Sequence, residues 1–305
     1  MMATFTETSD FPARRSESVL LAKEPLSQRA IIWRALKRNK LALFGITVII
    51  LLFVTTFGAP VFTSYDPIEM SPRERLQGPN LQHWLGTDSF GRDMLARILY
   101  GGRVSLSVGM AAVTLLMAIG IVLGAIAGYY GGWTDSVIMR FVDVMLSIPN
   151  FFLLLTIVAL FGPSLRNTMI IIGLTSWMAT ARIVRGQFLA ERQKDYVTSA
   201  RSIGASHARI IWHHLLPNTV AVIIVYATLW FAFSVILEAS LSYLGLGAQP
   251  PTPSWGNMLR EGRRYMRDAW WVTAFPGLFI FLTAMCFNMV GDGLRDALDP
   301  RLNKR

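Results

Sequence analysis

The chain has 305 residues, of which 53% are hydrophobic and only 16% are charged, and its formal net charge is +10. A mean hydropathy of +0.43, with this excess of apolar over charged residues, excludes an ordinary soluble domain and indicates a membrane protein. The single cysteine, Cys286, lies in an apolar run, so the chain can form neither an internal disulfide nor a cysteine-based metal site.

Long apolar runs predict the membrane-crossing helices, because about 20 residues are needed to cross roughly 30 Å of hydrocarbon. Charge-free runs of this kind occupy residues 41–62, 104–130, 219–237 and 272–291. Two weaker candidates are 141–161, which contains Asp143, and 168–181, which is short unless Arg182 extends toward the membrane surface. The predicted fold class is therefore all-α, a polytopic membrane protein with six transmembrane helices.

An even number of spans places both termini on one side of the membrane. If that side is the cytoplasm, most of the 29 Lys and Arg residues lie inside, with a dense group directly before the first span. The net charge then follows from topology, and no nucleic-acid partner is expected. We expect these regions: a cytoplasmic tail at 1–40, the first span with a periplasmic segment at 41–103, a permease core at 104–291 and a cytoplasmic tail at 292–305.

The segment just before the second span carries its own helical pattern. Apolar residues recur at helical spacing from Met94 to Leu99, beside Arg92 and Arg97. This pattern predicts a helix at the membrane interface within residues 88–103.

Glycines in the second span predict tight helix packing rather than a nucleotide site. Gly120, Gly124 and Gly128 follow one another at intervals of four and share one helix face. The glycine-rich run lacks the lysine of a phosphate-binding loop and lies in a span. The chain therefore has no ATP site of its own.

Prolines and acids in or near the spans are the candidates for a pathway or gate. Pro149 and Pro276 lie inside the third and sixth spans, where each is expected to kink its helix, either as a static bend or as a hinge. Asp143 and Glu238 are the acids nearest the membrane interior. Because Arg140 lies three residues before Asp143 on the same face, a structural role for that acid is favoured.

Between the fourth and fifth spans lies a polar stretch, DYVTSARSIGASHARIIWHHLLPN, at residues 195–218. Its first part predicts a short amphipathic helix that begins at Asp195 and places Tyr196, Ala200 and Ile203 on one face.

The second part of this stretch predicts a turn and another short helix. Gly204 can adopt the left-handed conformation that ends the first helix, and Ser206 is a good N-cap for the second. Pro217 then either ends that second helix or begins the fifth span. We call residues 195–217 the elbow.

Histidines in the elbow raise the possibility of a metal site. His213 and His214 are neighbours that point to different helix faces, and Asp195 is the one acid that accompanies them and His207. No metal is expected. An intramembrane enzyme and a passive channel are the competing classes. The sequence lacks the HExxH and GxSxG motifs of hydrolases in a suitable context, which counts against the enzyme.

The elbow resembles the cytoplasmic signature of binding-protein-dependent ABC importer permeases. That signature has small residues, a glycine and then a Leu-Pro pair, here Ala200, Gly204 and Leu216-Pro217. Its opening Glu-Ala is Thr198-Ser199 in this chain, so no ionic role is carried over. His214 replaces its late isoleucine, in an HxLPN form that is common in the peptide-importing branch.

The resemblance covers nearly the whole chain. It extends through LKRNKLALFG (36–45), HWLGTDSFGRDMLARILYGGRVSLSVG (83–109), LSYLGLGAQPPTPSWGNML (241–259) and GDGLRDALDPRL (291–302). These motifs are similar to the C-type permease subunit of dipeptide, oligopeptide and nickel importers, and they imply a type I ABC importer permease fold in the bacterial inner membrane.

The resemblance also implies partners and a coupling site. The expected partners are a homologous second permease, one or two ATP-binding subunits that carry ATP and Mg, a periplasmic or lipid-anchored substrate-binding protein, and membrane lipids. The residues expected to couple the elbow to an ATPase subunit are Asp195, Tyr196, Ala200, Gly204, Ala205, Ser206, Leu216 and Pro217.

Two further expectations rest on the resemblance. Dipeptides or short oligopeptides are the favoured substrate, with nickel, glutathione and haem-related compounds as alternatives. Arginines at 260–267, next to tryptophans that fit an aromatic belt, could pair either with acidic groups of a substrate-binding protein or with lipid phosphates.

Overall fold

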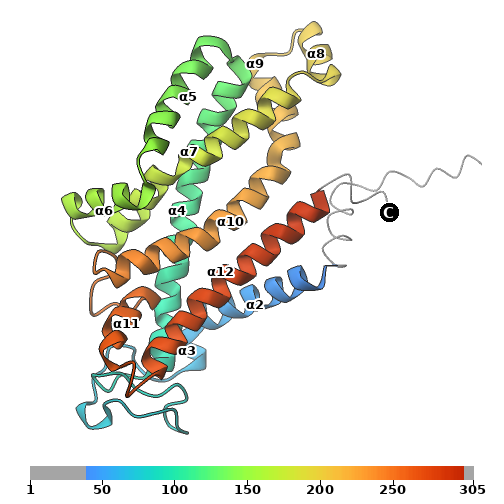
Figure 1. Ribbon diagram of the computed structural model, residues 1–305. Coiled ribbons are helices and arrows are strands. Elements are labelled where there is room, and N and C mark those ends of the chain that lie inside the picture. Colours follow the sequence, from blue (N-terminus) through green and yellow to red (C-terminus); the bar gives the residue numbers. More distant parts are fainter. Residues whose placement is uncertain (1–38, 299–305) are drawn as a thin grey trace, which may run out of the picture.

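The computed structural model describes residues 39–298, which fold into long helices joined by connections, the longest of which is residues 63–93 (Figure 1). Most of the predicted tail at 1–40, and residues 299–305 of the predicted tail at 292–305, lie outside the described residues. The elements are α2 (Lys40–Phe57), α3 (Ala59–Phe62), η1 (Pro72–Glu74), α4 (Met94–Tyr130), α5 (Gly132–Ser147), α6 (Asn150–Phe161), α7 (Leu165–Glu191), α8 (Asp195–Ser202), α9 (His207–Arg209), η2 (Ile210–Leu215), α10 (Leu216–Tyr243), α11 (Trp255–Gly262), η3 (Arg263–Tyr265) and α12 (Trp271–Leu298).

Helix length and composition support a polytopic membrane protein. Among residues 39–298, four helices are long and apolar enough to cross a membrane, namely α2, α4, α12 and the continuous helix His207–Tyr243. The pair α5 and α6 supplies a fifth span if it is counted as one. The all-α polytopic class is confirmed. The fourth predicted span, 168–181, lies within the longer and more polar α7, so the number of six stays a prediction, as do the region boundaries.

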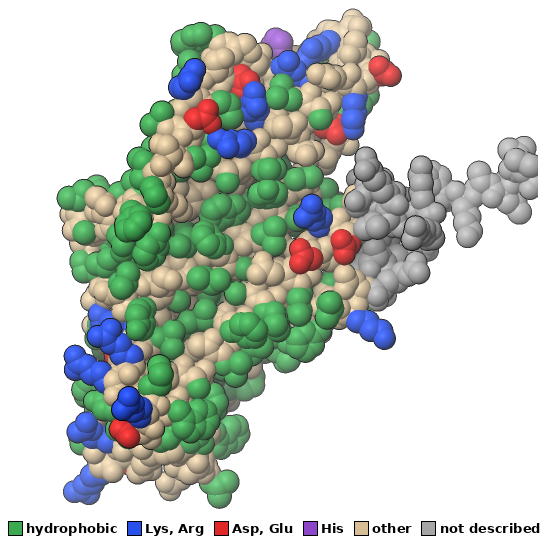
Figure 2. All heavy atoms as spheres, in the orientation of Figure 1, with side chains coloured by type: hydrophobic (Ala, Val, Ile, Leu, Met, Phe, Trp, Pro, Cys, Tyr) green, Lys and Arg blue, Asp and Glu red, His purple; other side chains and the backbone are tan. Residues whose placement is uncertain are grey.

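Apolar and charged side chains are distributed along the molecule as expected for a membrane protein. Figure 2 shows hydrophobic side chains over the middle of the helices, with charged ones gathered around the elbow, around the end of α12 and near α11. We call the end that carries residues 63–93 and α11 the lobe end, and the end that carries α8 and α9 the elbow end (Figure 1).

Close packing of α4 on α7 is confirmed at the predicted glycine face. A Cβ atom at Gly124 would lie 2.5 Å from the carbonyl oxygen of Ala181, and one at Gly128 would lie 2.6 Å from Cβ of Phe188. No larger side chain fits at these positions without moving a backbone, so the glycines set the distance between the two helices.

The bend predicted at Pro149, within the candidate span 141–161, is present as a break between two helices. Helix α5 ends at Ser147, α6 begins at Asn150, and the two axes differ by 84°. Proline lacks an N–H and disfavours helical geometry in the residue before it, and Ile148 is accordingly extended at φ −89° and ψ 125°. The chain therefore breaks at Pro149, whereas Pro276 is buried inside the continuous α12, as predicted.

The predicted interface helix within 88–103 is not a separate element. Residues 88–93 form a loop, and α4 runs without interruption for 37 residues from Met94. The Asp93 side chain caps it by accepting a hydrogen bond from the backbone N–H of Ala96 at 2.7 Å. The helical spacing was therefore correct, but it marked the first turns of a long span.

Candidate functional site

The first elbow helix, α8, buries a different face from the predicted one. Val197 is completely buried and Ala200 is 5% exposed, in one apolar cluster with residues of α4, α7 and η2. Tyr196 is half-buried, but Ile203 is 85% exposed. The helix ends at Ser202, so Ile203 no longer follows helical spacing and its side chain turns outward. The prediction for Ile203 is wrong for this reason.

The predicted glycine turn is confirmed. Gly204 has φ +81°, the left-handed conformation that costs other residues free energy. The N–H of Ala205 donates to the carbonyl of Ala200, and the N–H of Gly204 donates to that of Arg201, both at 3.0 Å. This is the Schellman arrangement, which closes a helix with its own backbone.

Ser206 caps the second elbow helix, as predicted. Its Oγ accepts a hydrogen bond from the N–H of Arg209 at 3.3 Å. The helix does not stop at Pro217, because it continues through the π-helical turn η2 into α10. Of the two alternatives for Pro217, the structure supports the beginning of the fifth span, where Leu216 and Pro217 form the first turn of α10.

Two contacts that sequence reasoning missed hold the end of α4, the first to the elbow and the second to the end of α7. The Tyr129 hydroxyl lies 2.7 Å from Nδ1 of His207, in hydrogen-bonding contact. Arg192 Nη1 donates to the carbonyls of Gly128 at 3.2 Å and Tyr129 at 3.0 Å. Tyr129 is only 4% exposed. A tyrosine at the last turn of a span was visible in the sequence, but its histidine partner lies 78 residues away.

Tyr196 ties α8 to both flanking helices. Its hydroxyl donates to Glu191 Oε2 at 2.8 Å, and Asn218 Nδ2 donates to the same hydroxyl at 3.3 Å. Burial, helped by the negative Glu191, raises the pKa of Tyr196 to about 12. Asp195, in contrast, is exposed at the start of α8.

The gate candidate Asp143 has a different partner from the predicted one. It accepts a hydrogen bond from Arg182 Nη2 on α7 at 2.6 Å, so the interpretation that paired it with Arg140 is wrong. The predicted pairing used spacing within one helix, whereas α5 packs beside α7. Both members of the pair are at least half exposed.

Glu238 lies inside the subunit. It is completely buried between α4, α10 and α11, and it accepts hydrogen bonds from Ser105 Oγ at 2.8 Å and Ser242 Oγ at 2.6 Å. Ser105 Oγ also accepts from the N–H of Trp255 at 3.3 Å. This geometry locks three helices together. It does not bring Glu238 to the exposed Asp143, so the four gate candidates do not form one site.

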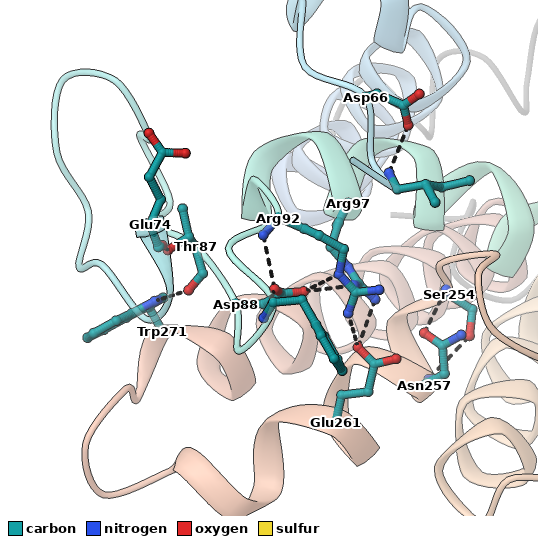
Figure 3. Close-up of polar contacts among 12 residues, drawn as sticks. Asp66, Glu74, Thr87, Asp88, Arg92, Arg97, Ser254, Asn257, Glu261 and Trp271 are labelled. Atoms are coloured by element: carbon teal, nitrogen blue, oxygen red, sulfur yellow. Dashed lines mark hydrogen bonds and ion pairs between the residues drawn. The ribbon is translucent and has the colours of Figure 1, made fainter. Parts of the chain in front are cut away.

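A buried ion cluster at the lobe end was not predicted (Figure 3). Asp88 Oδ2 lies 2.6 Å from Arg92 and 2.7 Å from Arg97, and Glu261 Oε2 lies 2.6 Å and 3.0 Å from the same two arginines. Burial and the nearby Asp88 raise the pKa of Glu261, while Arg92 acts in the opposite direction. Glu261 lies 164 residues beyond Arg97, which no local pattern reveals.

Within residues 39–298, no group of three or more His, Cys, Asp or Glu side chains is placed to hold a metal ion. The polar groups of the described residues instead include the elbow joint at one end, the ion cluster at the other, and the buried Glu238 with its two serines between them. With the long apolar helices that connect the two ends, these features define a multi-pass membrane protein.

Comparison with known proteins identifies the family. The family described as binding-protein-dependent transport system inner membrane component matches residues 120–304, and this chain belongs to it. Residues 27–79 match the N-terminal TM domain of oligopeptide transport permease C. A chain of the inward-facing MetNI methionine ABC transporter is similar in fold, with a TM-score of 0.53 and 18% identity over 65% of this chain and 95% of that one.

Similar sequences include permeases with named substrates. The dipeptide transport system permease protein DppC of Alkalihalophilus pseudofirmus is 46% identical, over 88% of this chain and 89% of that protein. The glutathione transport system permease protein GsiD of Pectobacterium atrosepticum is 45% identical, over 88% and 90%. The di/tripeptide permease DppC of Pseudomonas aeruginosa is 41% identical, over 95% and 97%.

Family membership decides between the classes that the sequence left open. The chain is a multi-pass inner-membrane permease of an ABC importer of the peptide family, and it is not itself an ATPase. The intramembrane enzyme and the passive channel are therefore set aside.

Proposed function

We propose that this chain is one of two permease subunits of an importer that carries dipeptides or short oligopeptides into the cell. Relatives above 40% identity carry dipeptides, di/tripeptides and glutathione by name. Glutathione is itself a tripeptide, so short peptides are the class that these names share. Nickel and haem-related compounds are the alternative substrates, and they require a different set of pathway contacts.

The observation that carries the proposal is the elbow. Backbone hydrogen bonds close its turn, and side-chain and helical contacts join it to the membrane helices. The Tyr129–His207 contact connects it to the end of α4, while the π-helical turn makes it continuous with α10. Ile203 and Trp212 leave apolar surface at its tip, 85% and 60% exposed. When a partner that binds this tip moves, α4 and α10 move with the elbow.

The partner in this proposal is an ATP-binding subunit. One or two such subunits carry ATP and Mg, and their closure swings the elbows of this chain and of a homologous second permease. The spans then change from inward-facing to outward-facing. A periplasmic or lipid-anchored substrate-binding protein delivers the peptide at the lobe end.

The proposal places the elbow and both termini in the cytoplasm. Helix α2 runs toward the lobe end and α12 runs away from it, so the first described residue of α2 and the last of α12 lie on the side away from the lobe (Figure 1). A Cβ atom at Gly293 would lie 2.5 Å from Cβ of Ala42, which agrees with this pairing of the two helix ends. The elbow shares that side.

Replacing Gly204 by valine tests the coupling role. Nothing lies within 4 Å of a Cβ atom at Gly204, so the substitution acts through its φ of +81° and not through a clash. Gly162 is a matched control, because it has φ +86° and equally open space but lies between α6 and α7. We expect Gly204→Val to lower uptake of labelled dipeptide per ATP hydrolysed, and Gly162→Val to leave that ratio unchanged.

Unchanged transport in Gly204→Val would contradict the coupling role. The substrate is tested separately, by measuring ATP-dependent uptake of dipeptides, longer peptides and nickel in cells that lack the chain, with and without its restoration. Restored uptake of peptides is expected, and restoration of nickel uptake alone would replace the peptide proposal by its alternative.

A further inference from the structure

A second group of arginines at the lobe end is not used by the buried ion cluster. Arg260, Arg263 and Arg264 make no ion pair with any residue of 39–298. Arg260 is half-buried, and the other two are exposed. Figure 2 shows Lys and Arg side chains gathered near α11. Their charges are therefore available to a ligand.

These arginines line one pocket, with a volume of about 510 Å³. This size is within the range of sites that hold small ligands. Ser89, Tyr243 and Tyr265 supply hydroxyl groups to the same pocket.

The acid in the pocket wall does not cancel the positive charge. Glu261 also lines the pocket, but its Oε2 already lies 2.6 Å from Arg92 and 3.0 Å from Arg97. Together with Asp88, those two arginines and Glu261 form a balanced set of two cations and two anions. The three remaining arginines therefore leave the pocket with a net positive charge, which favours an anionic ligand.

The position of the pocket indicates the source of the anion. Tyr243 is the last residue of α10, a helix long and apolar enough to cross a membrane, so the pocket lies at the end of a candidate span. Two large apolar side chains that line the pocket are exposed, Phe90 by 45% and Leu244 by 52%. Met266 and Trp270, which follow the lining residue Tyr265 in the chain, are 57% and 55% exposed. Aromatic rings and arginines in this combination are typical of the headgroup region of a bilayer.

We propose that this pocket binds the phosphate of a phospholipid headgroup in the leaflet at the lobe end. Guanidinium groups bind phosphate oxygens through paired hydrogen bonds, and the exposed apolar rim contacts the glycerol and the first part of the acyl chains. The bound lipid contacts the surface of the subunit where Glu261 connects α11 to the first turns of α4. The proposal is independent of which substrate the importer carries.

The test measures lipid binding to the full-length chain, extracted in detergent together with its associated subunits. Native mass spectrometry after delipidation follows the titration of phosphatidylglycerol, with phosphatidylcholine and inorganic phosphate as separate arms. We expect the triple variant Arg260→Gln, Arg263→Gln, Arg264→Gln to weaken phosphatidylglycerol binding by about tenfold or more. Arg267→Gln is the matched control, because Arg267 is an exposed arginine of the same segment that does not line the pocket.

The single charge reversal Arg264→Glu guards against a triple variant that fails to fold, and it is expected to weaken binding in the same direction. Equal phosphatidylglycerol binding by the wild type, Arg264→Glu and Arg267→Gln would overturn the proposal. The proposal would also be overturned if the chain bound inorganic phosphate but did not bind phosphatidylglycerol. The same holds if an acidic partner protein bound at these arginines and phosphatidylglycerol did not.

Discussion

At the lobe end, two buried arginines are each bound by two carboxylates, whereas at the elbow end the joint with α4 consists of the Tyr129–His207 contact, the Arg201 guanidinium over the Tyr129 ring, and apolar packing. Removing one ion from a buried cluster leaves its partners uncompensated, while a single hydrogen bond contributes about 1 kcal/mol. The lobe end is therefore held by charged contacts that are costly to break, whereas the contacts of the elbow with α4 are individually weaker.

The largest difference between the two ends should appear when Asp88 is replaced by asparagine. Glu261 is then the one remaining carboxylate for both arginines, and we expect the free energy of unfolding to fall by about 3–5 kcal/mol. Thermal unfolding of the detergent-extracted protein measures the effect. Asp66→Asn is the control, because Asp66 is exposed and its Oδ1 accepts from the N–H of Ile68, which asparagine also allows. Equal midpoints for the two variants would remove the contrast between the ends.

A smaller effect on stability, but a specific one on transport, is expected from Tyr129→Phe. The substitution removes the 2.7 Å contact with His207 and should cost about 1 kcal/mol. Because the elbow then loses its side-chain hydrogen bond to α4, peptide uptake per ATP hydrolysed should fall. Tyr130→Phe provides the comparison, since Tyr130 is 55% exposed and packs edge-to-face on Tyr129. If both variants transport equally well, the joint does not transmit the movement.

The smallest effect concerns pH. The pKa of Tyr196 is raised from 10.0 to about 12, so the folded state holds its proton more tightly than the unfolded state. Its contribution to stability is therefore complete below the unfolded pKa and is lost as the pH rises through the folded pKa. The difference in tyrosinate absorbance between wild type and Tyr196→Phe should titrate at about 12. Glu191→Gln should lower that pKa, and titration of the wild type at the ordinary tyrosine value would contradict the geometry.

Sequence reasoning succeeded where a feature depends on neighbouring residues. The left-handed Gly204 and the Ser206 cap follow from backbone and capping preferences that act over a few positions. The Gly124 and Gly128 face also followed from spacing alone, because small residues at intervals of four have few other uses inside a span.

Sequence reasoning failed where the partner of a residue comes from an element that is distant in the sequence. Asp143 pairs with Arg182 from α7, because packing of α5 beside that helix overrides the spacing to Arg140. The ion cluster needs Glu261, which no pattern around Asp88 predicts. Pro149 was recognised as a bend, but an angle of 84° depends on where α6 packs and not on the proline alone.

Helix α4 gives the chain one continuous rod between its two ends. Its 37 residues rise by about 1.5 Å each, so it is about 55 Å long, well beyond the roughly 30 Å of hydrocarbon. The cap at Asp93 lies at one tip and Tyr129 lies in the last turn at the other. If the rod pivots at the fixed lobe, a tilt of about 10° carries the far tip through about 10 Å. A small angular change is thus converted into a large displacement by the length of a single helix.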